Sequence, residues 1–283
     1  MNARDLIVRP GHGVRLRDID PRHTYDFSDK RDAREKLRRD VEKLTALQDL
    51  FAAAQSHALL MVLQGMDSSG KDGAIKHVMS GVNPQGVEVH SFRQPSSEEL
   101  RHDFLWRTTR VLPERGRIGI FNRSYYEEVL VVRVHRELLE QEHVPGDGEA
   151  VWKHRYDDIN AFERHLARNG VVVLKFFLHI SKDEQRKRLL ARLDDPAKTW
   201  KFSLGDVTER EHWDHYMTAY EEMLAATSTD WAPWYVVPSD RKWFTRVAVA
   251  DILVAALQSL KLRYPTIDAK QRAALADIRT RLT

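Results

Sequence analysis

The sequence predicts an α/β protein, with a parallel sheet of about five strands covered by helices on both faces. Five short runs rich in apolar and β-branched residues alternate with longer segments of helical periodicity. A glycine-rich loop directly follows the first of these runs, and a helical segment follows the loop. Strands that are separated by helices require right-handed crossovers, which place helices on both sides of a parallel sheet. The expected architecture therefore has three layers.

Composition is that of a globular enzyme. The chain has 283 residues, of which 42% are hydrophobic, and this is enough to bury a full core in one domain. It contains no cysteine, which excludes disulfides, thiol catalysis and cysteine-bound zinc and slightly favours the cytosol. No stretch approaches the roughly 20 apolar residues of a membrane span, and the first residues lack the apolar core of a secretory signal. We expect a cytoplasmic protein.

Each element is expected from a local pattern. Residues 1–28 are irregular, and apolar residues at helical spacing predict a long helix from about Asp29 to Gln55, so residues 1–56 form an N-terminal extension. Strands are expected at 58–63, 86–92, 118–121, 171–178 and 234–237. The fourth is nearly all apolar, as a central parallel strand should be. A helix over 247–260 closes the core (57–262), and 263–283 form a helical tail. We predict one domain over residues 1–283.

The loop from Gly65 to Gly73 has the form GxxxxGK, which is typical of a phosphate-binding loop. Its glycines permit a tight turn in which backbone N–H groups point into one concavity, and the positive end of the next helix adds to their field. Lys71 supplies a mobile positive charge. A chance glycine-rich turn shares the bare pattern, but the flanking strand and helix favour the phosphate site. We assign phosphate binding to Gly65, Met66, Ser68, Ser69, Gly70, Lys71, Asp72, Gly73 and Lys76.

Two carboxylates distinguish this loop. The residue after the lysine is usually Ser or Thr, whose hydroxyl binds Mg²⁺, but here it is Asp72. Asp67 lies inside the loop itself. Because Mg²⁺ favours carboxylate and phosphate oxygens, we expect Asp67 to hold this metal, with Mn²⁺ as a substitute. Asp72 is interpreted as a residue that the helix dipole favours at the first turn.

A second group of polar residues follows the third strand. Ligands bind at the carboxyl ends of parallel strands. Kinases of this architecture often carry an acid there, but this chain has Asn122. Arg123 would direct its charged fork toward the phosphates, and Glu127 lies about one helical turn further. An internal salt bridge that orients a helix is an equal alternative for Arg123 and Glu127. We assign nucleotide binding to Asn122, Arg123, Tyr126, Glu127 and Arg133, and catalysis to Asp67, Lys71, Arg123 and Glu127.

Basic residues cluster after the fourth strand. Arg188 and Arg192 are four apart on one helix face, where like charges are destabilising unless a polyanion or a carboxylate neutralises them. The Asp195-Pro196 pair then breaks the helix, and Lys198 and Lys201 follow in a second basic segment. We interpret residues 181–206 as a phosphate-binding lid, in preference to a solvated charged face. Arg188, Arg192 and Lys201 are its expected phosphate ligands.

Together these motifs resemble the polyphosphate kinase 2 family. The likeness covers residues 63–73, 81–86, 104–107, 121–127 and the lid from Asp195 to Lys201, within a span of about Val8 to Leu260. It is closest to the class III type. Members that act on diphosphates typically have Asp at the position of Asn122 and Asn at that of Glu127, whereas the class III pattern Asn-Arg-Ser-Tyr-Tyr-Glu stands here unaltered.

The resemblance implies a P-loop kinase-like fold and a Mg²⁺-dependent phosphotransferase. Such an enzyme moves the terminal phosphoryl group of inorganic polyphosphate onto AMP or ADP, forms ATP, and can run in reverse; guanine nucleotides are further expected acceptors. By this resemblance Asp67 holds Mg²⁺, Lys71 binds the transferred group, Arg123 bridges donor and acceptor, and Arg188 and Arg192 close over them. A basic channel beyond the loop is expected on electrostatic grounds. We expect a homo-oligomer, dimeric or tetrameric, that binds no nucleic acid and no membrane.

Three other functions remain as alternatives. A nucleic-acid-stimulated NTPase would need similar electrostatics, but the basic residues cluster behind one strand and no nucleic-acid module is recognisable. A nucleotide-dependent switch would not need a lid. An ATP-dependent nucleotide kinase is the nearest competitor, because the local motifs would serve it equally.

Overall fold

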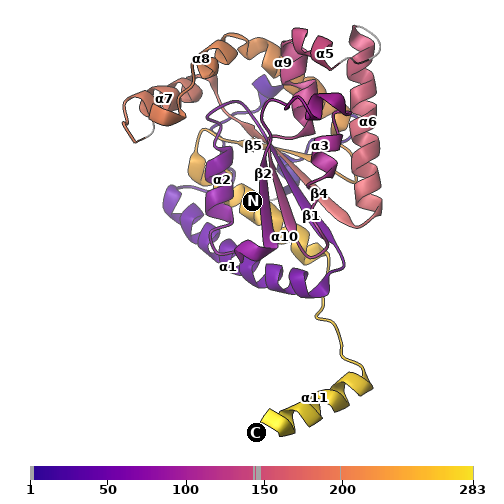
Figure 1. Ribbon diagram of the computed structural model, residues 1–283. Helices are drawn as coiled ribbons and strands as arrows, with labels where there is room; N and C mark the ends of the chain where they lie inside the picture. The colour runs from indigo at the N-terminus through magenta and orange to yellow at the C-terminus, as the bar shows by residue number, and fades with distance from the viewer. Residues whose placement is uncertain (1–2, 143, 145–147, 198, 283) are drawn as a thin grey trace.

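A computed structural model describes residues 3–142, 144, 148–197 and 199–282. Its centre is a five-stranded parallel sheet in the order β2-β3-β1-β4-β5, between two layers of helices (Figure 1). The strands are β1 (Ala58–Gln64), β2 (Val87–Ser91), β3 (Ile118–Asn122), β4 (Val171–His179) and β5 (Trp234–Pro238). The predicted α/β class is confirmed, and each strand ends within one residue of its expected position.

The sheet is buried on both faces, which explains why its strands are almost continuously apolar. Leu60 and Val62 of β1 pack into a core on one face, and Leu59, Met61 and Leu63 pack into a second core on the other. All five side chains are fully buried. The central position of β1 therefore fixes the phosphate-loop motif that follows it in the middle of the sheet edge.

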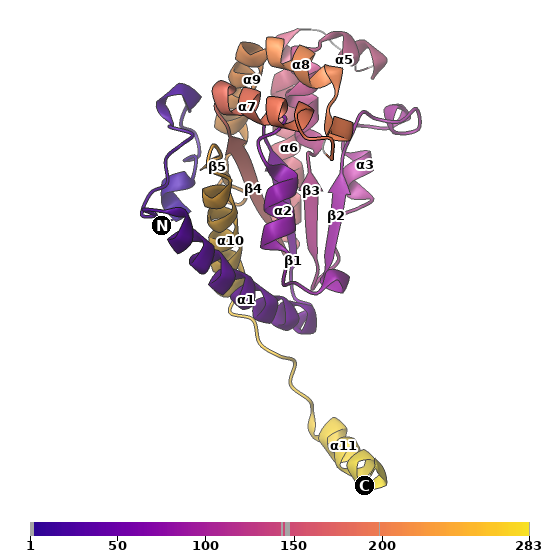
Figure 2. The ribbon, with the colours of Figure 1, turned by 90° about the vertical axis from the view of Figure 1, so that its left-hand side faces the viewer.

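The longer helices form the two outer layers (Figure 2). On one face lie α1 (Lys30–Ala54), α2 (Lys71–Val78) and α10 (Lys242–Ser259). The other face carries η5 (Tyr125–Val129), α4 (Val131–Val134), α6 (Glu149–Arg168) and α9 (Trp213–Thr227). The predicted long helix is α1, and Asp29 caps it by accepting hydrogen bonds from two backbone N–H groups. The closing helix α10 begins five residues earlier than expected.

Shorter elements connect the layers. From residue 3 to residue 29, the helices of the amino-terminal segment are the short turns η1 (Ala3–Leu6) and η2 (Leu16–Asp18), as the irregular pattern predicted. The segment runs along the edge strand β5, where the Val8 N–H donates to the Trp234 carbonyl at 2.9 Å. The remaining short elements are η3 (Pro84–Gly86), η4 (Glu99–Arg101), α3 (Trp106–Thr109) and α5 (Glu137–Gln141).

Two segments extend from this core. Above the carboxyl edge of the sheet lie α7 (Lys182–Leu193), η6 (Thr199–Lys201) and α8 (Leu204–Glu211). At the carboxyl terminus α11 (Ala269–Leu282) lies apart from the sheet at the end of an extended segment (Figures 1 and 2). In the described part of the chain, no helix is both long and apolar enough to cross a membrane.

Candidate active site

The site lies where the chain reverses direction across the sheet. The connection after β1 runs through α2 on one face, and the connection after the neighbouring strand β3 runs through α6 on the other. Such a switch point opens a crevice at the carboxyl ends of the two strands. The glycine-rich loop after β1 and the Asn122–Arg123 pair after β3, which lie far apart in the sequence, both border this crevice.

Several residues of the loop have positive φ angles, which are unfavourable for residues with a Cβ atom. Gly65 has a φ of 146°, and a Cβ atom there would lie 2.7 Å from the Leu178 carbonyl oxygen, so no larger residue fits. Gly70 has a φ of 112°, and Ser68 adopts a φ of 64° without being glycine. Residues with positive φ angles of this kind are common in ligand-binding loops.

Two hydroxyl groups of the loop are buried without a hydrogen-bond partner among the described residues. These are the hydroxyls of Ser68 and Ser69. Lys71, the first residue of α2, folds back so that Nζ donates to the carbonyls of Gly65 at 2.6 Å and Met66 at 3.3 Å. Burial lowers the pKa of Lys71, and repulsion from Arg123 lowers it further. A bound phosphate would satisfy both the hydroxyls and the ammonium.

Asp67 and Arg123 face each other across the crevice. The Arg123 guanidinium donates to Asp67 Oδ1 at 2.5 Å, and the Arg123 backbone, at a φ of 63°, donates to the Leu63 carbonyl at the end of β1. Burial alone would raise the pKa of Asp67, but the charges of Lys71 and Arg123 outweigh it and hold that pKa below its usual range. Asp67 is therefore ionised.

Glu127 belongs to the same cluster. It lies half-buried on η5, a 3-10 turn. Burial raises the pKa of Glu127, while the nearby charges of Arg123 and Lys71 oppose the rise. The structure thus brings Asp67, Lys71, Arg123 and Glu127 into one electrostatic unit. The Arg123–Asp67 ion pair connects the residue that follows β3 to the glycine-rich loop that follows β1. Arg123 therefore pairs with the loop and not only with residues of the turn that it begins.

Asn122 is tied to the start of α2. Its amide Nδ2 donates to Asp72 Oδ1 at 2.8 Å, and its Oδ1 is buried without a partner among the described residues. Asp72 therefore does more than complement a helix dipole, because it links the start of α2 to the end of β3. Asp67, Asp72 and the free Asn122 oxygen are hard donors of the kind that Mg²⁺ binds. The described residues hold no group of three or more His, Asp or Glu side chains that could bind a metal ion by themselves.

Arg188 is buried between α7 and the glycine-rich loop. Only 7% exposed, it donates to Glu184, to the loop carbonyls of Ser68 and Ser69 at 2.9 and 3.0 Å, and to the carbonyls of residues 239 and 240 at 2.6 and 2.9 Å. All its N–H directions are occupied. In this structure the Arg188 guanidinium holds the loop against α7, so its role as a phosphate ligand of the lid stays a prediction.

Arg192 remains directed toward the site. It pairs with Asp206 of α8 at 3.3 Å, and its charge contributes to the lowered pKa of Asp67 after those of Lys71 and Arg123. The segment after α7 continues through α8 to Glu211, so it is longer than the expected lid and carries acidic as well as basic residues. Lys198 lies outside the described residues, as does the side chain of Lys201.

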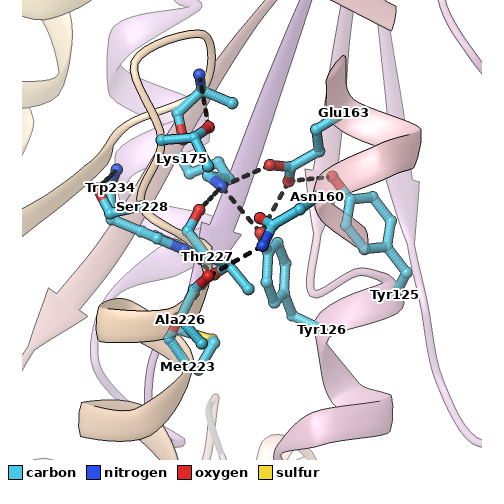
Figure 3. A network of polar contacts seen from close by, with 12 residues as sticks. Tyr125, Tyr126, Asn160, Glu163, Lys175, Met223, Ala226, Thr227, Ser228 and Trp234 are labelled. Carbon is cyan, nitrogen blue, oxygen red and sulfur yellow. Dashed lines mark hydrogen bonds and ion pairs between the residues drawn. The ribbon is translucent and has the colours of Figure 1, made fainter. Parts of the chain in front are cut away.

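Two of the expected nucleotide ligands lie elsewhere. Tyr126 is 0% exposed, and its hydroxyl contacts Glu163 and Lys175 inside the core (Figure 3). Arg133 forms ion pairs with Glu149 and Glu222. The tight 3-10 turn directs Tyr126 into the core, and the two carboxylates already neutralise Arg133. These contacts give no support to the assignment of the two residues to nucleotide binding, which stays a prediction. Lys76 lies exposed on α2, one turn after Asp72.

A buried polar network behind η5 was missed by sequence reasoning. Lys175 of β4 donates to Glu163 of α6 at 2.6 Å, to the Thr227 carbonyl at 2.7 Å and to the Tyr126 hydroxyl at 2.9 Å (Figure 3). Tyr125 donates to the same carboxylate at 2.8 Å. The network anchors the turn that carries Glu127 to two layers of the fold. Its signal in the sequence is one lysine in an otherwise apolar central strand.

A phosphate-binding loop with converging lysine, arginine and carboxylate groups defines a P-loop phosphotransferase site, and the comparisons with known proteins narrow this class. The family model described as Polyphosphate kinase 2 matches residues 27–265. The chain belongs to the polyphosphate kinase 2 family, as its motifs predicted.

Individual relatives agree with the family assignment. The chain is 52% identical to an ADP-polyphosphate phosphotransferase of Rhodopseudomonas palustris, with 90% of each chain covered. It is 48% identical to an AMP/ADP-polyphosphate phosphotransferase of Meiothermus ruber, over 91% of this chain and 94% of the relative. The crystal structure of polyphosphate kinase 2 from Arthrobacter aurescens TC1 matches with a TM-score of 0.88 at 42% identity, over 97% and 96% of the two chains.

Proposed function

We propose that this protein transfers phosphoryl groups between inorganic polyphosphate and nucleotides, converting AMP to ADP and ADP to ATP, and that it can run in reverse to lengthen polyphosphate. One observation carries the proposal: Asp67, Lys71, Arg123 and Glu127 converge on the phosphate loop between the ends of β1 and β3. The names of the relatives, which include AMP and ADP as substrates, support the choice of substrates.

The chemistry requires alignment and neutralisation of charge more than it requires an acid or a base. An oxygen of the acceptor's last phosphate attacks the terminal phosphorus of the donor. The bridging P–O bond breaks, and the shortened polyphosphate keeps the bridging oxygen. The loop N–H groups and Lys71 hold the transferred group. Arg123, which stays charged at any working pH, lies where it can contact donor and acceptor oxygens together.

Mg²⁺, with Mn²⁺ as a substitute, fits the donor atoms at the site. We propose that Asp67 holds the ion, and that Asn122 and Asp72, which contact each other, complete its ligands directly or through water. When bound, the ion supplies neutralisation of the phosphate oxygens. Asp67 is prepared for this role because its pKa is lowered and its carboxylate is charged.

Further properties belong to the same proposal. Glu127 marks the chain as class III, able to use monophosphates, and guanine nucleotides are expected as additional acceptors because the transfer involves only phosphates. We propose one domain over residues 1–283, a dimeric or tetrameric assembly, and a cytoplasmic location, which the absence of cysteine favours. The helices α7 and α8 form the lid of the proposed site.

The test omits ATP. The protein is incubated with AMP, Mg²⁺ and long-chain polyphosphate, and the nucleotides are separated over time. We expect ADP first and ATP later, no product with chelator, and none from a Lys71→Ala variant. Phosphorylation of AMP only when ATP is added would instead indicate an ATP-dependent nucleotide kinase. Phosphate release from ATP that nucleic acid stimulates would indicate the NTPase alternative.

A further inference from the structure

A basic hollow lies on the face of the sheet that carries α2. It encloses about 240 Å³ where α1 and α10 begin. Four of its seven lining residues are cations and none is an acid. The lining residues are Lys30, Ala33, Arg34, Leu37, Lys242, Trp243 and Arg246.

The side chains of the four cations form no hydrogen bond and no ion pair with any residue in the described part of the chain. Glu184 attracts Lys242 from a greater distance. Other cations on α1 behave differently, since Lys36 pairs with Asp40 and Arg38 with Glu42, each at 2.6 Å. A group of cations that the fold leaves uncompensated is an attractive site for an anion.

Electrostatics within the hollow are unfavourable without a ligand. Burial lowers the pKa of Arg246, and repulsion from Arg34 and Arg188 lowers it further. Burial likewise lowers the pKa of Lys242, and repulsion from Arg188 and Arg246 lowers it further, while attraction to Glu184 opposes the shift. Like charges that depress each other's pKa gain most when a polyanion neutralises them together.

One residue of the hollow, Arg246, lies beside the first turn of α2, which follows the phosphate loop. The Arg246 guanidinium lies 3.8 Å from the position that a Cβ on Gly73 would take, and Gly73 is in the first turn of α2. α2 and α10 run side by side on the same face of the sheet (Figure 2). A chain whose end lies in the loop can therefore reach the hollow along α2 and past Arg188, without crossing the sheet.

We propose that the hollow formed by Lys30, Arg34, Lys242 and Arg246 binds the distal phosphates of the polyphosphate donor. The inference rests on the proposed function and adds a second subsite to it. A flexible inorganic chain with about one charge per phosphate matches four cations on separate helix turns. A nucleotide whose last phosphate lies at the loop has too few further phosphates to reach the hollow. The subsite would make long chains better donors than short ones.

The experiment compares donors of different length. Arg34→Gln/Arg246→Gln is assayed with long-chain polyphosphate and with the shortest chain that the wild type uses, at several salt concentrations. We expect the KM for the long chain to rise about tenfold relative to that for the short chain. We also expect the slope of log KM against log salt to fall by about 1.5, because two phosphate contacts are lost. Lys30→Gln/Lys242→Gln should behave in the same way.

A matched control separates local binding from total charge. Arg39→Gln/Lys43→Gln removes two exposed cations from the same helix, and these point about 140° and 180° away from Arg34 around its axis. This control should keep the wild-type ratio of the two KM values. Thermal unfolding of each variant shows that it is folded.

Other outcomes overturn the inference. A KM that rises equally for both donors would place the hollow within the transfer site, and unchanged KM values would leave it without a role in donor binding. Loss of nucleic-acid binding with unchanged polyphosphate kinetics would assign it to another polyanion. If the wild type uses no polyphosphate of any length but phosphorylates AMP with ATP, the proposed function itself has failed.

Discussion

Asp67 is the carboxylate that we propose to bind the metal ion in this site. It lies between two cations, Lys71 and Arg123, which together outweigh the effect of burial and lower its pKa. Its charge is therefore available to a metal ion, and its loop position makes it replaceable without loss of core packing. The bond to Arg123 also shows that the residue proposed to hold the metal orients the residue proposed to contact the phosphates.

We predict that Asp67→Asn keeps the fold and abolishes turnover with Mg²⁺. The amide preserves the shape of the side chain but removes the charge that the metal and Arg123 require. Thermal unfolding and the polyphosphate-dependent formation of ADP are the two measurements. A variant that is stable and still turns over near the wild-type rate would remove Asp67 from the metal site.

Glu127 is predicted to control the choice of acceptor. A monophosphate leaves a space that a diphosphate fills with its extra phosphate, and a carboxylate can hold water or a cation there. Because positioning errors of about 1 Å can cost on the order of a hundredfold in rate, Glu127→Asn should impair AMP phosphorylation selectively. The readout is the ratio of kcat/KM for AMP and ADP. An unchanged ratio would make Glu127 a structural residue of η5.

The pKa of Glu127 gives this idea a second test. Burial raises the pKa above the usual value of a glutamate, about 4.3. As pH falls through the raised pKa, the carboxylate is neutralised, so the ratio of AMP to ADP use should fall earlier than for an ordinary glutamate. In Glu127→Asn the ratio should not change over the same pH range. A wild-type ratio that is independent of pH down to about 4.3 would contradict this role.

At the scale of elements, hydrogen bonds hold the helix α7 against the glycine-rich loop that it covers. Arg188 joins α7 to two loop carbonyls and to the turn between β5 and α10. Gln185, one turn earlier, donates to the Asp67 carbonyl at 3.1 Å. The first part of the lid is thus a wall of the site, and movement is more easily accommodated in the segment after Leu193.

We predict that Arg188→Ala lowers the free energy of unfolding by about 1–3 kcal/mol, because buried carbonyls lose their donors. Arg192→Ala, four residues further on the same helix, is the control. It should leave stability nearly unchanged and reduce kcat/KM, since Arg192 makes one half-exposed pair near the site. Chemical denaturation of both variants measures the two free energies of unfolding. Equal stability of the two would show that the Arg188 contacts are of no consequence for folding.

The elements of the fold could be predicted because each depends on neighbouring residues. The apolar runs give the strands, and the glycine pattern from Gly65 to Lys71 gives the loop. The contacts of Arg188 could not be predicted because its acceptors lie 120 and 51 residues away in sequence, at Ser68 and Ser239. The burial of Tyr126 could not be predicted because η5 is a 3-10 turn, which directs its neighbouring side chains differently from an α-helix. Such long-range contacts have no local pattern.

At the scale of the whole molecule, the Lys175 network joins the sheet to one helical layer and to the site. It connects β4, α6, η5 and the end of α9. Burial lowers the pKa of Lys175, while Glu163 opposes the effect. The pair is fully buried on both sides, so either partner alone would be an uncompensated charge in the core.

We predict that Lys175→Met destabilises the protein by about 3–5 kcal/mol, since it leaves Glu163 buried and unpaired. The double variant Lys175→Met/Glu163→Leu should recover most of that stability, because a buried ion pair can be replaced by apolar residues at little cost. The double variant should still have a reduced kcat, because the hydroxyls that fix η5 lose their partners. Wild-type kcat in a stable double variant would show that the network does not position Glu127.

The central claim is that one site transfers phosphoryl groups from polyphosphate to AMP and then to ADP. It is tested most directly by following a mixture of AMP, Mg²⁺ and long-chain polyphosphate by ³¹P NMR, without ATP. We predict that polyphosphate is consumed while ADP appears and then gives way to ATP, and that Asp67→Asn and Lys71→Ala show neither change. An unaltered spectrum with folded wild-type protein, or nucleotide phosphorylation that persists in both variants, would contradict the account.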